Sequence, residues 1–326
     1  MSPDSRAGHH GDVVYAFEDA GFDAEPNDTT PKIFGSNAVL DTFDGSQEAV
    51  RVFNADRTAA EIIEQVFDGS WTVTCDLGEP PWWLAGIFGQ PTSTNISGAL
   101  YEYTYDLSNA TDPTSLRLYL PTEGFSNYKV IPGAVIASVS IDQSQPNSPE
   151  LSISGAYARE PFEDNTLSLS VPDFGESTFS NRHAEVQVAG SSVGKVQNAN
   201  VSLEANTEMV NEVGSASAVD FIPKTFAPDV THDKIISTTE TTDLFDRFTG
   251  ASQAAIALKY DNGGTGEDVY TVDWNIVDSF PNSWSESGRN DPEADLMNEL
   301  QEIGEDANVV MQTDAGSSGN PPGITL

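Results

Sequence analysis

Histidine and cysteine, the side chains that most often carry out chemistry, are few in this chain of 326 residues. The histidines are His9, His10, His183 and His232, and none stands at a recognised zinc-ligand spacing. The single cysteine, Cys75, allows no disulfide within the chain, and its alternating apolar surroundings predict a small buried side chain. Glycine-rich phosphate loops do not occur. We therefore predict no catalytic, cofactor-binding or metal-binding residues, and no enzyme.

Carboxylates are so numerous that their spacing carries little information. With 51 Asp and Glu residues, pairs suited to a glycosidase arise by chance. The segment 261–268 holds Asp261, Asn262, Glu267 and Asp268, but it lacks the D-x-[DN]-x-[DN]-G spacing of a calcium loop. We predict a turn between two strands there.

The excess of acidic residues excludes nucleic acids as tightly bound partners. The chain has 14 Lys and Arg against 51 Asp and Glu, a formal charge of −37, and the acids are spread along it. Tight nucleic-acid binding needs clustered Lys and Arg at the phosphates. Dispersed acidity suits a surface hydrated at molar salt, where the Debye length is only about 3 Å. We therefore expect a halophilic source.

The adjacent pair Trp82–Trp83 is the one feature that favours sugar binding, because indole rings can stack on sugars. It lies in Pro81–Phe88, which predicts a short helix ending at Gly89. Amid strands, such a helix is more often a plug of the core. A carbohydrate-binding β-sandwich module and, less favoured, a glycosidase remain the alternatives to a structural protein.

Alternation with a period of two dominates the chain and predicts strands. In residues 124–160, two alternating runs flank the turn Gln143–Glu150, with apolar residues on one face and serines on the other. This predicts an antiparallel pair whose serine-rich face is either wet or packed on another copy. Further strands are expected at 13–17, 99–105, 115–120, 186–188, 200–203, 254–260, 269–277 and 308–313.

Other signals predict turns and helices. Asp68-Gly69 between apolar runs predicts a hairpin, although the capping box at Thr58 and Glu61 favours a helix there. Thr242–Phe248 predicts a second short helix. Asp291 as N-cap, Pro292 and Gly304 predict a C-terminal helix over Asp291–Ile303.

These elements suggest three parts. Residues 1–56 form an N-terminal arm and loop, 57–280 a β core with two β-rich halves at about 57–160 and 184–280, and 281–326 a C-terminal helix and tail. The order of strands, short helix and strand pair occurs twice loosely, but sequence identity between the halves is too weak to establish a repeat. The polar terminal segments are expected to be held by neighbouring molecules.

Several segments together resemble the tail tube proteins of long-tailed viruses. The resemblance is carried by Pro132–Ile141 with Glu150–Gly155, by the helix Trp82–Gly89, and by Pro31–Gly35. Val186–Val188, Asn200–Leu203 and Thr242–Gly250 follow in the same order, so that the likeness spans about 13–280. The fold expected is mainly β, a sandwich or barrel of the tail tube type with short flanking helices and a C-terminal helix.

The resemblance also implies a function. The subunit would form hexameric rings stacked head to tail into a hollow tube, with other tail proteins at the ends. Viral DNA would pass through the lumen without specific binding. No apolar run is long enough to cross a membrane and no leader is evident, so we expect a virion protein assembled in the host cytoplasm, from a virus of haloarchaea.

Overall fold

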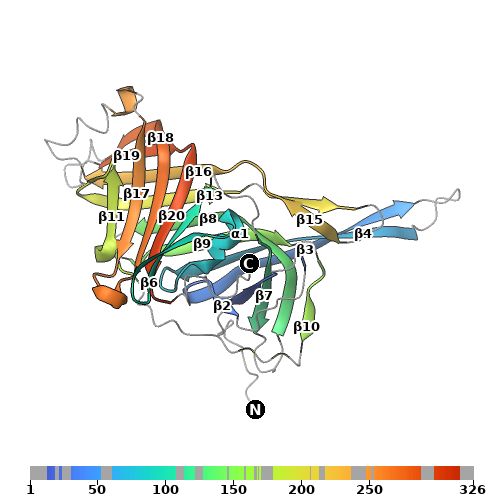
Figure 1. The fold of residues 1–326 in the computed structure, drawn as a ribbon. Helices are drawn as coiled ribbons and strands as arrows, with labels where there is room; N and C mark the ends of the chain where they lie inside the picture. The colour runs from blue at the N-terminus through green and yellow to red at the C-terminus, as the bar shows by residue number, and fades with distance from the viewer. Residues whose placement is uncertain are drawn as a thin grey trace, which may run out of the picture.

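The computed structural model describes residues 13–18, 22–23, 31–52, 61–107, 114–121, 128–144, 147–157, 159–164, 167, 169, 179–205, 207–212, 217–235, 247–250, 253–287 and 297–315. Among them the protein is mainly β (Figure 1).

Ten strands lie in the first half of the chain: β1 Val14–Phe17, β2 Lys32–Ile33, β3 Ser36–Val52, β4 Glu61–Asp76, β5 Thr92–Ser97, β6 Leu100–Asp106, β7 Leu116–Pro121, β8 Tyr128–Ser144, β9 Glu150–Tyr157 and β10 Phe162–Asp164. Ten more follow: β11 Ala184–Val188, β12 Ser191–Ser192, β13 Val196–Glu204, β14 Glu208–Asn211, β15 Ala218–Ile222, β16 Ala227–Ile235, β17 Ala254–Asp261, β18 Thr271–Ser287, β19 Met297–Ile303 and β20 Asp306–Thr313. The helical turns are η1 Trp82–Leu84, α1 Ala85–Phe88, η3 Asn181–His183 and η4 Gly266–Asp268, and residues 247–250 are also helical.

Eight strands pair side by side in the order β3-β4-β9-β8-β13-β16-β19-β18, and every neighbouring pair is antiparallel. We call this the long sheet. Only the C-terminal halves of β8 and β18 belong to it. Their N-terminal halves bend away and join two further rows, β2-β1-β7-β8-β10 and β12-β11-β17-β18-β20.

The two halves of the chain therefore repeat one pattern of pairing. In each half a short hairpin is followed by the two long-sheet strands β3 and β4, or β13 and β16. A helical segment comes next, then a strand that pairs with a bent strand, and finally two strands that flank the bent one. The hairpins β5–β6 and β14–β15 are insertions in this pattern.

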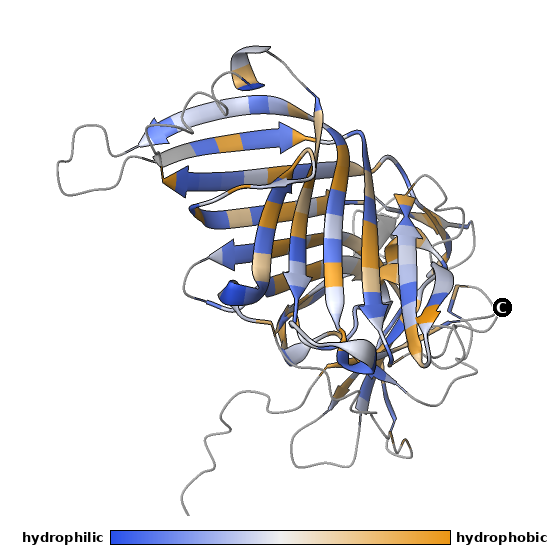
Figure 2. Cartoon of the chain, turned by 60° about the vertical axis from the view of Figure 1, so that its left-hand side comes forward, coloured by the Kyte–Doolittle hydropathy of each residue, from blue (hydrophilic) through white to orange (hydrophobic). Residues whose placement is uncertain are grey.

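Alternation explains which side of the long sheet is buried. On β9, Leu151, Ile153 and Tyr157 are at most 1% exposed, and on β13, Val201 and Leu203 are at most 2% exposed. Their neighbours along each strand are polar and partly exposed, so that the strands appear banded in Figure 2. The buried side belongs to the same hydrophobic cluster as the short helix and the second rows. Within this cluster, the ring of Trp83 from the short helix lies 6.4 Å from that of Trp274 in the second row. The predicted strand pair at 124–160 and its apolar face are confirmed.

The short helix before Gly89 is also confirmed, as η1 and α1 with every residue buried. Gly89 has a φ of 73°, a conformation that favours glycine at the end of a helix.

The hairpin predicted at Asp68-Gly69 is wrong. β4 runs straight through both residues, and β3 pairs with it along its length. Gly69 serves a close approach instead of a turn, because a Cβ there would lie 2.2 Å from the ring of Tyr157. The choice of strand over helix in this region is correct for residues 61–76.

The helix predicted over Asp291–Ile303 is also wrong where the structure describes it. Met297–Ile303 is strand β19, which pairs with β16 on one side and β18 on the other. Leu300 and Glu302 point inward at 0% exposed, whereas Ile303 is 43% exposed. Two ladders of backbone hydrogen bonds outweigh helix propensity, which is a weak prior.

Within the segment 1–56, which was expected to be an arm and loop, strands at 14–17, 32–33 and 36–52 pair within the chain. Tyr15 and Phe17 of β1 are 0% exposed, and β1 pairs with β2 and β7. β3 also occupies much of the stretch expected to be a loop before residue 56. Of the helix predicted at Thr242–Phe248, only Arg247 and Phe248 are described, and both are helical.

Candidate functional site

The solvent-facing side of the long sheet is the most distinctive polar surface. Although Ile303 is exposed too, most of the outward residues on β4, β9, β8, β13, β16 and β19 carry hydroxyl, amide or carboxylate groups. They include Thr72, Thr74, Asp76, Ser152, Ser154, Ser138, Ser140, Asp142, Asn198, Asn200, Ser202, Asp229, Thr231, Asp233, Glu299 and Gln301. We call this the polar face.

Cross-strand pairing arranges these groups in rows. One row runs through Thr74, Ser152, Ser140, Ser202 and Asp229 on successive strands. Ser138 and Ser154 share a hydrogen bond of 2.6 Å between their hydroxyls. Such short side chains leave the face low and open to solvent within one chain. The predicted alternatives, a wet face or one packed on another copy, both remain compatible with it.

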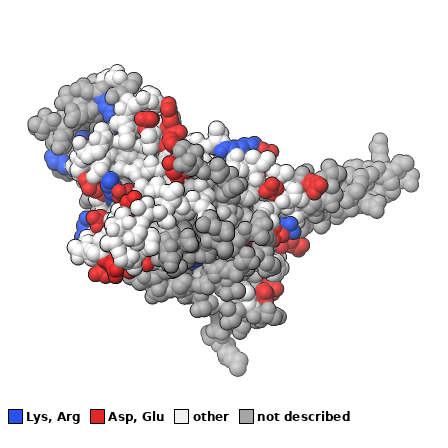
Figure 3. Space-filling view, in the orientation of Figure 1, with Lys and Arg blue, Asp and Glu red and all other residues white. Residues whose placement is uncertain are grey.

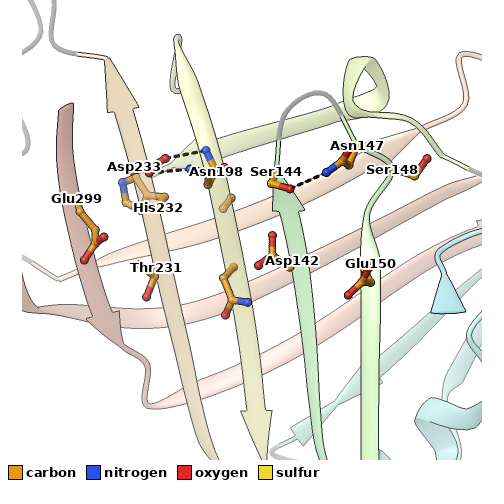
Figure 4. A pocket seen from close by; sticks show the side chains of 12 residues that line it. Asp142, Ser144, Asn147, Ser148, Glu150, Asn198, Thr231, His232, Asp233 and Glu299 are labelled. Carbon is orange, nitrogen blue, oxygen red and sulfur yellow. Dashed lines mark hydrogen bonds between the residues drawn. The ribbon is translucent and has the colours of Figure 1, made fainter. Parts of the chain in front are cut away.

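Carboxylates gather where β8, β13, β16 and β19 border a depression of about 480 Å³ (Figure 4). Asp142, Glu150, Asp233 and Glu299 line it. Asp233 is held in place, because its two oxygens accept hydrogen bonds from the Asn198 backbone N–H at 2.7 Å and side-chain amide at 2.8 Å. Nearby, desolvation and then the charge of Glu204 raise the pKa of Asp229. The face of the molecule drawn in Figure 3 shows more surface from Asp and Glu, in red, than from Lys and Arg, in blue.

Both ends of the long sheet are edges among the described strands. β3 pairs only with β4, and the segment Phe280–Ser287 of β18 pairs only with β19. Exposed strand edges template pairing with another chain. The β3–β4 hairpin also projects away from the body (Figure 1).

Trp82 and Trp83 do not form a sugar platform. They are 1% and 0% exposed, and the Trp83 indole N–H donates a 2.9 Å hydrogen bond to the Phe34 carbonyl. The Trp82 ring packs edge-on against Tyr103 at 4.9 Å. The interpretation of this pair as a core plug is confirmed.

The acidic loop after β17 is a turn, as predicted. Asn262 Oδ1 accepts hydrogen bonds from the Gly264 and Tyr270 N–H groups, and Asp261 Oδ1 accepts one from Gly263. The loop thus uses these side-chain oxygens to hold its own backbone.

The cysteine and the two described histidines, Cys75, His183 and His232, do not form a common site. Cys75 is buried at 4% exposed, as predicted, and burial raises the pKa of its thiol. His232 is 1% exposed, and desolvation followed by the charge of Arg247 lowers its pKa to about 4. His183 accepts a hydrogen bond from the Ser180 N–H, and His9 and His10 lie outside the described residues. Within the described part of the chain, no three His, Cys, Asp or Glu side chains converge as a metal site.

Two buried ion pairs were not predicted, because nothing local in the sequence marks them. Glu302 accepts hydrogen bonds from Arg247 and from the Ser279 hydroxyl. Glu18 accepts bonds from the Gly133 N–H at 3.0 Å and the Ser115 hydroxyl at 2.7 Å, and Arg117 lies 3.5 Å away. Both pairs join segments distant in sequence, which indicates structural roles.

The Glu18 carboxyl should make stability depend on pH. Desolvation by burial raises its pKa to about 7, although the Gly133 and Ser115 hydrogen bonds oppose the shift. The folded pKa is higher than the unfolded one, so this contribution is present below about pH 4.5 and lost as pH rises through 7. We expect a loss of about 3 kcal/mol across that range.

The measurement is chemical unfolding of wild type and Glu18→Gln from pH 4.5 to 8 at constant high salt. The amide cannot ionise, so the variant should gain stability relative to wild type as pH rises. If the wild type instead becomes more stable relative to the variant as pH rises, the raised pKa assigned to Glu18 is contradicted.

No helix among the described residues is long and apolar enough to cross a membrane. A mainly β protein whose described long sheet has two unpaired edges is suited to assembly through strand pairing with other chains. The family model for the phage tail tube protein matches residues 9–324, so the chain belongs to that family, which is structural and not enzymatic. No curated protein matches the chain. The protein is accordingly a component of a virion tail that assembles with itself and with other tail proteins.

Proposed function

We propose that the protein forms rings with six tail-tube units around a lumen, and that stacked rings make the conduit for genome delivery. The family match over residues 9–324 carries this proposal. The hexameric rings implied by the sequence resemblance are its starting point.

The polar face is the wall of the lumen in this proposal. Its outward groups on β8, β9 and β13 include Ser138, Ser140, Asp142, Ser154 and Asn200, none of them cationic. Phosphate binding requires cations, so such a wall repels DNA weakly and gives it no attachment point. The duplex passes along a hydrated surface without specific contacts.

The projecting β3–β4 hairpin is the proposed contact between stacked rings. Its pairing continues as far as Val52 and Glu61, and the hairpin extends away from the body in Figure 1. A contact repeated around the ring gains strength because many identical copies act together.

The acidic surface suits assembly in concentrated salt, and we infer a virus of a halophilic host. The formal charge of −37 on 326 residues supports this.

Electron microscopy of the purified protein in high salt tests the function directly. Wild type should form rings and long tubes. Replacing residues 49–65 by Asn-Gly joins Glu48 to Val66, which already face each other, and shortens the hairpin. This variant should still form rings but should lose tubes longer than a few rings.

The matched control shortens the other hairpin, replacing residues 211–219 by Asn-Gly between Val210 and Asp220. It should leave tubes unchanged. If the control abolishes tubes and the β3–β4 variant does not, the contact between rings lies at β14–β15. If wild type forms neither rings nor tubes, the proposed function is wrong.

A further inference from the structure

The two halves of the chain agree in the irregularities of their strands as well as in their pairing. β8 bends at Gly133 and β18 at Asp278, and both residues have positive φ, 62° and 51°. Each bent strand then has a one-residue register shift, after Ile136 in β8 and after Pro281 in β18. Both the bends and the shifts lie 145 positions apart.

The strands that precede and pair with the bent strands, β7 with β8 and β17 with β18, also have register shifts at equivalent places in the two halves. The register of β7 shifts between Leu116 and Leu118, opposite β8, and that of β17 shifts between Ala254 and Ile256, opposite β18. β3 and β13 each have a shift near their start, before Val39 and before Asn198, and β3 has two more, before Thr42 and before Arg51, that β13 lacks. A positive φ at a residue other than glycine is uncommon, so this agreement points to one structural unit present twice, in residues 13–164 and 184–313.

The units meet at β8 and β13, in the middle of the long sheet. There Ser140 faces Ser202, Asp142 faces Asn200, and the buried Val139 faces Leu203. This pairing joins the last long-sheet strand of one unit to the first of the next. The chain thus contains one complete copy of a joint between units, and its outer edges β18 and β3 are the two halves of a second copy.

We propose that β18 of one molecule pairs with β3 of the next in the register of the internal joint, and that three chains close a ring of six units. This inference rests on the proposed function for the number of units in the ring. It replaces six chains per ring by three.

The register follows from the equivalent positions. Ser140 corresponds to Ser285, 145 residues later. In the first unit Val135 faces Ala156, Ala156 faces Ser70, and Ser70 faces Asp44. In the second unit Phe280, 145 residues after Val135, faces Ile303, Ile303 faces Asp229, and Asp229 faces Ser202, so Ser202 corresponds to Asp44. Ser285 therefore lies opposite Asp44 of the next copy.

The next pair along the joint fits in volume. At the joint between two molecules, Trp284 takes the place of Val139, and Gly45 of the next copy takes the place of Leu203. A large ring therefore lies beside a position without a side chain. Within its own chain Gly45 faces Gly69, over which the Tyr157 ring already lies. The Tyr157 hydroxyl donates a 2.9 Å hydrogen bond to the Asp44 carbonyl, which fixes this part of the edge.

Strand direction allows the joint. The long sheet has an even number of strands that alternate in direction, so β3 of the next copy runs antiparallel to β18, as β13 does to β8. Three chains would place 24 strands around the lumen and six would place 48, giving bores of about 37 and 73 Å at about 4.8 Å per strand before tilt. The smaller bore suits a single duplex.

Ring mass is the first test, measured by native mass spectrometry of wild type in volatile high salt and by the symmetry of rings in electron micrographs. One chain has a mass of 34.9 kDa, so three chains give about 105 kDa and six about 209 kDa. A ring of three chains with pseudo-sixfold density is expected, and a ring of six chains overturns the proposal.

Crosslinking is the second test, in a Cys75→Ser background. Asp44→Cys with Ser285→Cys should give, on oxidation of assembled protein, dimers and trimers on a non-reducing gel and nothing larger. Facing Cα atoms in antiparallel strands lie about 4.5 or 5.5 Å apart, within disulfide range.

Two matched pairs control the register. Ser140→Cys with Ser202→Cys, which face each other within one chain, should form a disulfide without any ladder. Thr42→Cys with Ser285→Cys is displaced along the edge, where diagonal neighbours are about 7–8 Å apart, and should crosslink poorly. If assembled tubes crosslink through Thr42 and not through Asp44, the register is wrong while the tube function stands. If no rings form in wild type, the proposed function fails and this inference with it.

Discussion

Removing salt is expected to take the assembled rings and tubes apart. The formal charge of −37 per chain repels itself and its neighbours, and the Debye length grows from about 3 Å at 1 M to about 30 Å at 0.01 M salt. Asp44 on β3 and Glu286 on β18 place carboxylates of like charge on the two edges of the proposed joint. Sedimentation velocity after dialysis to 0.01 M salt should show loss of most of the assembled material.

The assembly should depend on ionic strength and not on the identity of a particular ion. Sodium chloride and potassium chloride at equal concentration should restore assembly equally, whereas sucrose at equal osmolarity should not. Tubes that persist unchanged in dilute buffer would contradict the electrostatic explanation and the inference of a halophilic host.

The second large effect is expected at Trp83. Its ring is 0% exposed, packs near Trp274 and bonds to the Phe34 carbonyl. Trp83→Ala should lower the free energy of unfolding by about 3–5 kcal/mol, through lost burial and the cavity left behind. Trp83→Phe should cost about 1–3 kcal/mol, mainly because the buried carbonyl of Phe34 loses its donor.

Denaturant unfolding in high salt, followed by circular dichroism, measures both changes. Ile96→Ala is the matched control, because Ile96 is 48% exposed on β5, and it should change stability by no more than about 0.5 kcal/mol. A Trp83→Ala variant as stable as this control would show that the ring is not part of the core.

Local pattern was sufficient for much of the fold. Strands at β6, β7, β8, β9, β17 and β20 were predicted because each alternates over its own few residues. The helix before Gly89 was predicted because glycine tolerates the positive φ that ends it. The charge of −37 follows from composition, and the lack of metal-ligand spacings follows from the positions of the histidines and the cysteine. Both observations predicted a protein without a catalytic or metal site.

Long-range pairing decided the rest. Residues 297–303 follow good helix signals but become a strand because β16 and β18 supply partners on both sides. Asp68-Gly69 has the composition of a turn, but β3 and β9 hold it within a continuous strand, and the Tyr157 ring requires the glycine. Such partners come from distant residues, which no local window contains.

The likeness between the two halves depended most on tertiary structure. The bend of β8 uses a glycine and that of β18 an aspartate, and the facing pair Val139 and Leu203 corresponds to Trp284 and Gly45. The amino acids differ because different side chains can satisfy the same backbone bend or fill the same volume. Backbone hydrogen bonds fix the order and register of the strands, so the pairing is alike in both halves although the sequence shows only a loose resemblance between them.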